Sequence, residues 1–291
     1  MTKSDIDAAR HFLAASARIV DRRRFERMFD GGPAEPVRAA VAAYRNTDGG
    51  FGNALEPDVR SPGSQPAAID LALRILDEAG AWQGADDELV TGACDWLQAH
   101  APDGGGSMFV EPTIDGWPHA PWWVPPETRQ ASLISTGMLA GTLHARGVTH
   151  PWLSAATELL WSRVDGLTTP EAYEMLGVFR FLDHVPDRDR AALTARRAGQ
   201  LLLDGGLVEL DPEAPGETHS PLDFAPLPGS AGRAVFGAEV IERHLDHLAS
   251  AQREDGGWTV NWLAWSPAAE QDWRGFVTVS NLALLRANGR C

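Results

Sequence analysis

The stretch Gln252-Arg253-Glu254-Asp255-Gly256-Gly257-Trp258 follows residues 240–251, whose apolar positions have helical spacing. Glycine just past a helix is a common C-terminal cap, because it adopts the left-handed backbone conformation without a Cβ clash. Asp-Gly-Gly also occurs at 48–50, 103–105 and 204–206, and a shorter Asp-Gly occurs at 165–166. Each follows its own stretch of helical spacing, at 37–45, 89–99, 191–203 and 153–164 respectively. Five such turns in one chain predict a stack of helical hairpins.

A second helical stretch follows most of these turns. These stretches are 65–79, 129–146, 170–183 and 273–287, with 8–20 as an earlier member. Strand signals are weak, since period-two alternation and β-branched runs are scarce. We therefore expect an all-α chain and a single domain over 1–291. The expected fold is an α/α toroid, an incomplete or irregular six-hairpin barrel of about ten or eleven inner and outer helices around a central cavity. A generic all-α protein is the plainer alternative.

The segment 205–232 breaks the pattern, because the repeat requires an inner helix there. Proline removes a backbone donor and opposes helix continuation, so no regular helix of three turns is expected. We expect this segment to fold over the open side of the barrel. Its prolines are Pro212, Pro215, Pro221, Pro226 and Pro228.

Composition excludes several classes of protein. The chain has 25 Lys and Arg against 40 Asp and Glu, a formal charge of −15, which disfavours nucleic acid and anionic membrane surfaces as partners. No apolar run reaches the roughly 18 residues of a membrane span. The first residues carry acids and lack a long apolar core, unlike a secretory signal. Two cysteines, Cys94 and Cys291, do not form a disulfide framework. A cytoplasmic protein is expected.

The stretch 252–258 resembles the Gln/Trp repeat, Gln-x3-Gly-x-Trp, of terpenoid cyclases and protein prenyltransferases. A second copy at 45–51 has Arg45 in the Gln position and Phe51 in the Trp position, and 98–109 is a looser third copy. The resemblance implies the α/α barrel of the squalene-cyclase and protein-prenyltransferase families. It also implies that the Gln bonds to backbone groups and that the aromatic ring packs on the neighbouring repeat.

The chain departs from the characterised members of that superfamily at their reactive motifs. It has no Asp-x-Asp-Asp proton-donor motif and no Asp-Asp-x-x-Asp motif for magnesium and diphosphate, because Asp86-Asp87-Glu88 lacks the spacing. The prenyltransferase zinc set is also absent, since Asp95 follows Cys94 instead of preceding it by two. No metal site and no cofactor are expected.

If each turn ends an outer helix, the loops that follow all emerge on one rim of the toroid. Four of these loops are unusual in sequence: 51–60, 109–126, 207–232 and 259–274. Loops on a rigid scaffold often carry function. We expect the catalytic candidates to be Glu56, Asp58, His219 and Asp223. The expected substrate-binding residues are Trp117, His119, Trp122, Trp123, Trp262, Trp265, Trp273 and Arg274.

Each candidate also has a structural interpretation. Glu56 and Asp58 could cap the next helix, although Gln65-Pro66 marks its start several residues later. The indoles at 117, 122 and 123 could plug the barrel end, and His219 with Asp223 could staple a loop. Glu270 and Arg274 have the i,i+4 spacing of a surface ion pair. The functional hypothesis depends on all four loops meeting at one mouth.

Three functions fit such a mouth. A terpenoid-cyclase-like enzyme would hold an apolar isoprenoid-type substrate in a closed Trp-lined cavity, protonate it with a buried carboxylic acid and stabilise the cation on indole faces. A saccharide hydrolase or lyase would use an open polar groove with two carboxylates and sugar-stacking Trp. A non-catalytic binding module for an apolar ligand needs no buried acid. The Gln/Trp resemblance favours the first function.

Overall fold

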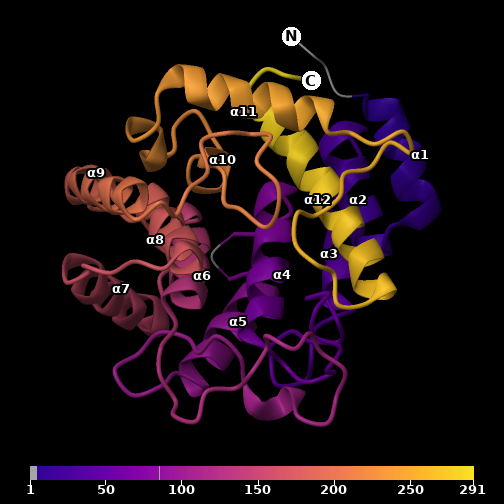
Figure 1. The fold of residues 1–291 in the computed structure, drawn as a ribbon. Helices are drawn as coiled ribbons and strands as arrows, with labels where there is room; N and C mark the ends of the chain where they lie inside the picture. Colours follow the sequence, from indigo (N-terminus) through magenta and orange to yellow (C-terminus); the bar gives the residue numbers. More distant parts are fainter. Residues whose placement is uncertain (1–4, 85) are drawn as a thin grey trace.

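The computed structural model describes residues 5–84 and 86–291 (Figure 1). Within these residues no β-strand forms, and only two isolated bridges occur, Arg45 with Phe51 and Val59 with His119. The all-α prediction is confirmed. No helix among the described residues is long and apolar enough to cross a bilayer. The α-helices are α1 (Ile6–Ser16), α2 (Ile19–Phe29), α3 (Glu35–Ala42), α4 (Pro66–Glu78), α5 (Glu88–Ala99), α6 (Leu133–Ala145), α7 (Pro151–Asp165), α8 (Ala172–His184), α9 (Arg188–Asp204), α10 (Pro221–Phe224), α11 (Ala238–Ser250) and α12 (Pro267–Ala287), with 3-10 helices η1 (Pro112–Ile114) and η2 (Ala231–Ala234).

The helices pack in pairs around a centre (Figure 1). Along the inner side, α4 contacts α6, α6 contacts α8, α8 contacts α10, and α12 contacts α2. On the outside, α5, α7 and α9 pack against α4, α6 and α8 in turn, and α11 packs against α10 and α12. The first and last helices meet, since α1 also contacts α12. The closed toroid, the finer part of the expectation, stays a prediction.

The Gln/Trp turn joins the two ends of the described chain. The Gln252 side chain accepts from Asp5 N at 2.7 Å and donates to Asp5 O at 2.8 Å. Trp258 is buried, and its indole N–H donates to Leu248 O at 2.8 Å. Phe51, in the second copy, is completely buried. The prediction that both rings are structural core residues agrees with their burial.

Three of the Gly-Gly turns are not the helix caps that the sequence predicts. Helices α3, α5 and α11 end several residues earlier, at Ala42, Ala99 and Ser250. In two of these turns the aspartate accepts from the second glycine's N–H, as Asp48 does from Gly50 and Asp255 from Gly257, both at 3.0 Å. The first glycine has positive φ and allows the next hairpin to approach, because a Cβ at Gly49 would clash with the Gly92 carbonyl. Gly166 and Gly205 do lie at C-caps.

One predicted helix, 8–20, is wrong, because the chain breaks at Ala17 and Arg18 between α1 and α2. The sequence does not predict helix α2. Its buried face carries Asp21 and Arg24 alongside Val20 and Phe25, so the apolar residues alone do not show helical spacing. The segment 205–232 is irregular, as expected. The one α-helix of this segment is the four-residue α10, whose N-terminus is capped by a capping box of Ser220 and Asp223.

Candidate functional site

Glu56 and Asp58 lie on a strained turn between α3 and α4. Asn53 and Ala54 have φ of 56° and 62°, a left-handed conformation that costs a non-glycine residue on the order of 1 kcal/mol. Arg18, at the break between α1 and α2, donates from Nη1 to the Leu55 carbonyl at 2.8 Å and also pairs with buried Asp21 at 2.8 Å. An arginine from a distant part of the sequence therefore holds this turn in place.

The two carboxyl groups are buried side by side. Glu56 Oε1 accepts from Asp58 N at 3.2 Å. Burial, followed by the charge of Asp58, raises the pKa of Glu56 to about 8, against the opposing charge of Arg18. Burial also raises the pKa of Asp58, while Trp273, Arg60 and Trp265 act in the opposite direction. Glu56 is therefore protonated at neutral pH and can act as a proton donor.

Three loops meet around this pair, as the rim hypothesis requires. The turn at 58–60 pairs with the second loop, because Ala120 N donates to Asp58 O at 2.8 Å and Arg60 N to Pro118 O at 2.9 Å. Arg60 also forms an ion pair of 2.9 Å with Asp272, at the start of α12. Trp123 stacks on Phe109 with ring centroids 4.6 Å apart, in a small buried cluster against which Trp265 packs.

The indoles of the site differ from those of the core. The N–H groups of Trp96, Trp152 and Trp258 each donate to a structural acceptor, namely Asp48 Oδ2, Gly106 O and Leu248 O. By contrast, the buried N–H groups of Trp123, Trp265 and Trp273 reach no acceptor with hydrogen-bond geometry among the described residues, and Asp58 Oδ1 has no donor. Trp265 and Trp273 lie close enough to Asp58 to lower its pKa. The indoles of Trp265 and Trp273 therefore face Asp58 and favour its ionised form, whereas the Trp123 N–H has no partner among the described residues.

The third loop joins the site at its edge. Asn261, in the fourth loop, donates from Nδ2 to Thr218 O at 2.8 Å. Next to Thr218, the His219 ring meets Tyr173 edge-on, with centroids 4.6 Å apart. The pKa of Tyr173 is raised by burial and by a hydrogen bond to Glu217, with smaller contributions from Asp223 and Asp58. Tyr173 therefore links the third loop electrostatically to the Glu56–Asp58 turn.

Several candidates lie elsewhere or act structurally. Asp223 accepts from Ser220 N at 2.6 Å and completes the capping box of α10, so this hydrogen bond is structural. Arg274 pairs with Asp255 at 2.7 Å and lies 4.5 Å from the Phe12 centroid, so it belongs to the Gln/Trp turn and forms no pair with Glu270.

The remaining indoles and His119 have contacts of their own. Trp117 and Trp122 are half exposed, and Trp262 meets Trp273 edge-on at 5.4 Å. His119 Nδ1 lies 2.8 Å from Trp117 O.

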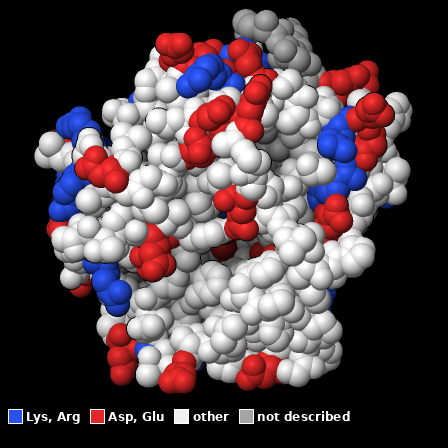
Figure 2. All heavy atoms as spheres, viewed as in Figure 1, with Lys and Arg blue, Asp and Glu red and all other residues white. Residues whose placement is uncertain are grey.

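The molecule is hollowed near the middle of the face shown in Figure 2, with acidic side chains inside the hollow. Asp70, Arg74 and Glu78 repeat at i, i+4 and i+8 along α4. Their side chains keep 14%, 23% and 29% of their exposure, although desolvation is the largest influence on the pKa of each. These three side chains are therefore surrounded by protein atoms but still contact solvent. These three charged side chains lie on an inner helix, where the cyclase hypothesis predicts an apolar wall.

Sequence reasoning missed Arg18, Tyr44, Tyr173 and the α4 stripe. The stripe could have been found, because three charges at four-residue spacing interrupt an otherwise apolar helix. The charges of Arg18, Asp21 and Asp272 all act on the pKa of Tyr44, so this side chain lies beside the same turn. Tyrosine is also rare in this chain, with 2 Tyr beside 11 Trp, and that rarity could have drawn attention to Tyr44 and Tyr173. Within the described residues, no three His, Cys, Asp or Glu side chains are grouped to hold a metal ion.

Comparison with known proteins identifies a fold and no family. No protein-family model matches the chain, and no curated protein matches it. One similar solved structure is described as a protein from Actinoplanes, with a TM-score of 0.60 and 16% identity over 98% of both chains. At that identity the likeness extends to the fold alone. The two chains share an architecture along nearly their whole length.

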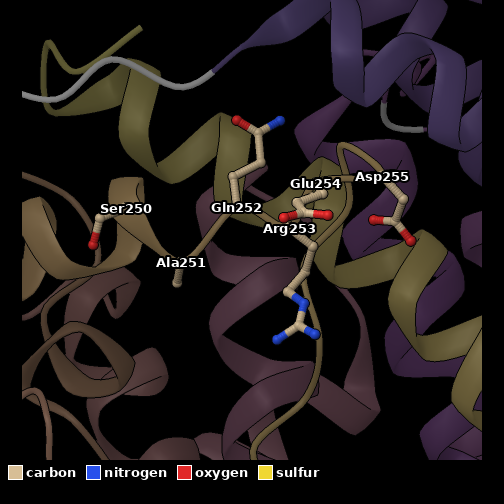
Figure 3. A pocket seen from close by; sticks show the side chains of 6 residues that line it. All are labelled: Ser250, Ala251, Gln252, Arg253, Glu254 and Asp255. Carbon is tan, nitrogen blue, oxygen red and sulfur yellow. The ribbon is translucent and has the colours of Figure 1, made fainter.

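A separate surface pocket lies at the Gln/Trp turn (Figure 3). It is lined by residues 250–255, and no residue of the Glu56–Asp58 site borders it. Gln252 is engaged there with the backbone of Asp5 and Gly256, and Asp255 with Arg274. This pocket therefore lies where the N-terminal end of α1 meets the Gln/Trp turn.

Proposed function

We propose that the protein is a glycoside hydrolase in which Glu56 is the general acid and Asp58 is its partner carboxylate. One observation carries the proposal: two buried carboxyl groups, Glu56 and Asp58, lie beside the indoles of Trp265 and Trp273, and Asp58 Oδ1 and the Trp123 N–H lack partners among the described residues. Leaving a buried polar group unpaired costs about 1–3 kcal/mol. A hydroxyl group both accepts and donates, so adjacent sugar hydroxyls would accept from the Trp123 N–H and donate to Asp58.

The surroundings also suit a saccharide better than an isoprenoid. A hydrocarbon would leave Asp58 Oδ1 and the Trp123 N–H unpaired. At the mouth, Trp117 and Trp122 are half exposed and offer flat faces on which sugar rings stack. The sequence analysis expects a carbohydrate-active enzyme to have an open polar groove with two carboxylates and sugar-stacking Trp.

The two carboxyl groups have separable roles. Glu56 donates its proton to the leaving-group oxygen as the glycosidic carbon–oxygen bond breaks. Two indoles and Arg60 favour the charge of Asp58, which takes a proton from the attacking water. The proton then returns to Glu56 through solvent. Arg18 and the strained turn hold Glu56 in position.

The test is hydrolysis of a panel of neutral and acidic oligosaccharides, measured as new reducing ends. We expect at least one substrate to be cleaved, and Glu56→Gln to lower its rate by roughly 100-fold or more, because proton donation is lost. Asp58→Asn should be similarly impaired. Glu158→Gln, on the exposed face of α7, is the matched control and should keep full activity. Equal rates for Glu56→Gln and wild type on a cleaved substrate would overturn the assignment.

A terpenoid-cyclase-like activity is the second candidate, favoured by a protonated acid beside indole rings and by the Gln/Trp turn. Its reaction would consume Glu56's proton at a carbon–carbon double bond. Incubation with squalene or geranylgeranyl diphosphate, followed by mass spectrometry of the extract, distinguishes it. A cyclised product that disappears in Glu56→Gln would replace the hydrolase proposal.

A further inference from the structure

The N-terminal part of α12 joins two parts of the molecule that are far apart in the sequence. Its three consecutive residues Asp272, Trp273 and Arg274 each contact a different group. Asp272 forms the ion pair of 2.9 Å with Arg60, two positions after Asp58. Arg274 pairs with an aspartate of the Gln/Trp turn at 2.7 Å. One short stretch of helix therefore contacts both the turn that carries the carboxyl pair and the Gln/Trp turn.

Trp273 lies between these two contacts, and neighbouring rings fix its indole. It meets Trp262 edge-on, with ring centroids 5.4 Å apart, and Phe276 edge-on at 5.8 Å. Phe276 is three residues further along α12, so the helix itself holds the second ring in place. The Trp273 N–H is buried, and Asp58 is the carboxyl group on which it acts. The two rings therefore hold this N–H toward Asp58.

An indole suits this position chemically. Burial raises the pKa of Asp58, and Trp273 opposes that rise more strongly than Arg60 or Trp265 does. Arg60 is shared, because its guanidinium also pairs with Asp272. An indole N–H donates only and does not titrate near neutral pH, so its effect on a carboxylate persists over the whole working range of pH. Trp273 therefore favours the charge of Asp58 without adding another acid or base to the site.

Other titratable groups surround the carboxyl pair without replacing this contact. The pKa of Tyr173 on α8 is raised by burial first and also by the charge of Asp58. His119, in the second loop, pairs with the backbone of Val59. The titratable and charged groups that face the pair from the surrounding elements are Arg18, Glu56, Arg60, Asp70, Arg74, His119, Tyr173 and Asp272. Of these, Arg60 favours the charge of Asp58, as Trp273 does.

We propose that Asp272 and Trp273 are positioning residues for Asp58, and that Arg274 fixes both of them to the Gln/Trp turn. Trp273 directs its N–H at the carboxylate, and Asp272 keeps Arg60 beside it. This inference rests on the proposed hydrolase function, in which Asp58 takes a proton from water, but the ionisation of Asp58 can be measured without a substrate. The Gln/Trp turn then supports the site as well as joining the two ends of the described chain.

The test uses Trp273→Phe, which keeps a flat ring and removes the N–H. NMR of the aspartate carboxyl carbons, with the Asp58 signal assigned from Asp58→Asn, follows the titration of Asp58 in the whole protein. We expect the pKa of Asp58 to rise by about one pH unit in Trp273→Phe, because the charged form loses a donor. Trp96→Phe is the matched control: it also removes an indole N–H from a carboxylate, Asp48 at 3.1 Å, and should leave Asp58 unchanged. Circular dichroism checks that each variant folds.

Hydrolysis gives a second measurement. On a cleaved oligosaccharide, the acidic limb of the pH–rate profile should move upward by about one pH unit in Trp273→Phe, since Asp58 must be ionised to act as the base. Asp272→Asn should slow hydrolysis about tenfold, because Arg60 loses its partner and the turn shifts. Asp272→Glu should keep most of the rate, because a glutamate can still pair with Arg60.

Other outcomes overturn the inference. An unchanged titration of Asp58 in Trp273→Phe, or an equal shift in Trp96→Phe, would remove the role of Trp273. In the wild-type protein, an indole N–H signal should shift as Asp58 titrates and stop doing so in Asp58→Asn; the absence of any such signal would also overturn the inference, whether or not Trp273→Phe folds. If Asp58 responds as expected and no saccharide is cleaved, the hydrolase proposal fails and the positioning role stands. Cleavage without a response of Asp58 has the reverse meaning.

Discussion

Glu56 and Asp58 are two positions apart, yet their surroundings differ. The carboxyl of Glu56 meets a backbone N–H and the charge of Arg18, whereas Asp58 faces two indole N–H groups and Arg60. Burial raises the pKa of both groups, but the groups that oppose this rise differ, which is the kind of difference that assigns neighbouring carboxyl groups different roles in acid–base chemistry. The distinction comes from the side chains around each group, which four separate segments supply.

Glu56→Gln should change how stability depends on pH. The folded pKa of Glu56, about 8, lies above its ordinary value of 4.5. Between these values the unfolded chain loses the proton that the folded protein keeps, so ionisation favours unfolding as pH rises. Wild type should therefore lose stability, on the order of a few kcal/mol, from pH 4.5 to 8, and the variant should lose less.

Denaturant unfolding at several pH values, compared between wild type and Glu56→Gln, measures this effect. Glu158→Gln, whose side chain is exposed, should follow the wild-type curve. Parallel curves for Glu56→Gln and wild type would show that Glu56 is ionised normally in the folded protein.

Trp258→Ala should destabilise the protein by about 3–5 kcal/mol, because it empties a large buried volume and removes the hydrogen bond to Leu248 O. Trp117→Ala removes the same side chain from a half-exposed position and should change stability by less than about 0.5 kcal/mol. Chemical denaturation of both variants gives the comparison. A loss in Trp258→Ala no larger than that in Trp117→Ala would contradict the structural role of the motif.

At the scale of the helices, the α6–α8 contact sets the position of Arg180. These helices approach through glycines, because a Cβ at Gly137 would clash with the carbonyl of Gly177, and one at Gly141 with that of Arg180. The close approach brings Arg180 against Thr142, within reach of α4. Sequence patterns missed this contact, since glycine inside a helix reads as a weakness unless its partner is known.

Gly177→Ala should cost roughly 1–3 kcal/mol, because the added methyl meets the Leu133 carbonyl and the Ile134 backbone of α6. This loss opposes the gain of about 1 kcal/mol that alanine gives in an exposed helix. Gly229→Ala is the control, since a Cβ there meets no atom within 4 Å. Thermal unfolding of both variants decides the point: an equally stable Gly177→Ala would mean that α6 and α8 can separate freely.

Across the whole molecule, the sequence predicts the parts that depend on local chemistry. The Gly-Gly turns predict hairpins, and the hairpins predict that the loops carrying Glu56, Asp58, Trp123, Trp265 and Trp273 lie on one rim. The sequence does not predict the positions of Arg24 and Arg180, because both look like ordinary surface charges until the packing of α2 and α8 against other helices is known. The break at Arg18 escaped for a related reason, since the acceptor of its guanidinium lies 37 positions away.

Closure of the chain provides the last prediction. Gln252 makes two hydrogen bonds to the backbone of Asp5 and so ties the N-terminal end of α1 to the turn before α12. Gln252→Ala removes both bonds, which are worth about 1 kcal/mol each. Because α1 lies at the end of the described chain, it should open before the rest of the protein does. Hydrogen exchange in α1, measured by mass spectrometry, should become about tenfold faster, whereas exchange in α6 and α8 should change little. Gln200→Ala is the control, since that side chain bonds only to Asp204 one turn along α9. Unchanged exchange in α1 would mean that helix packing alone joins the two ends, and equal acceleration in α8 would mean that the ring opens as one unit.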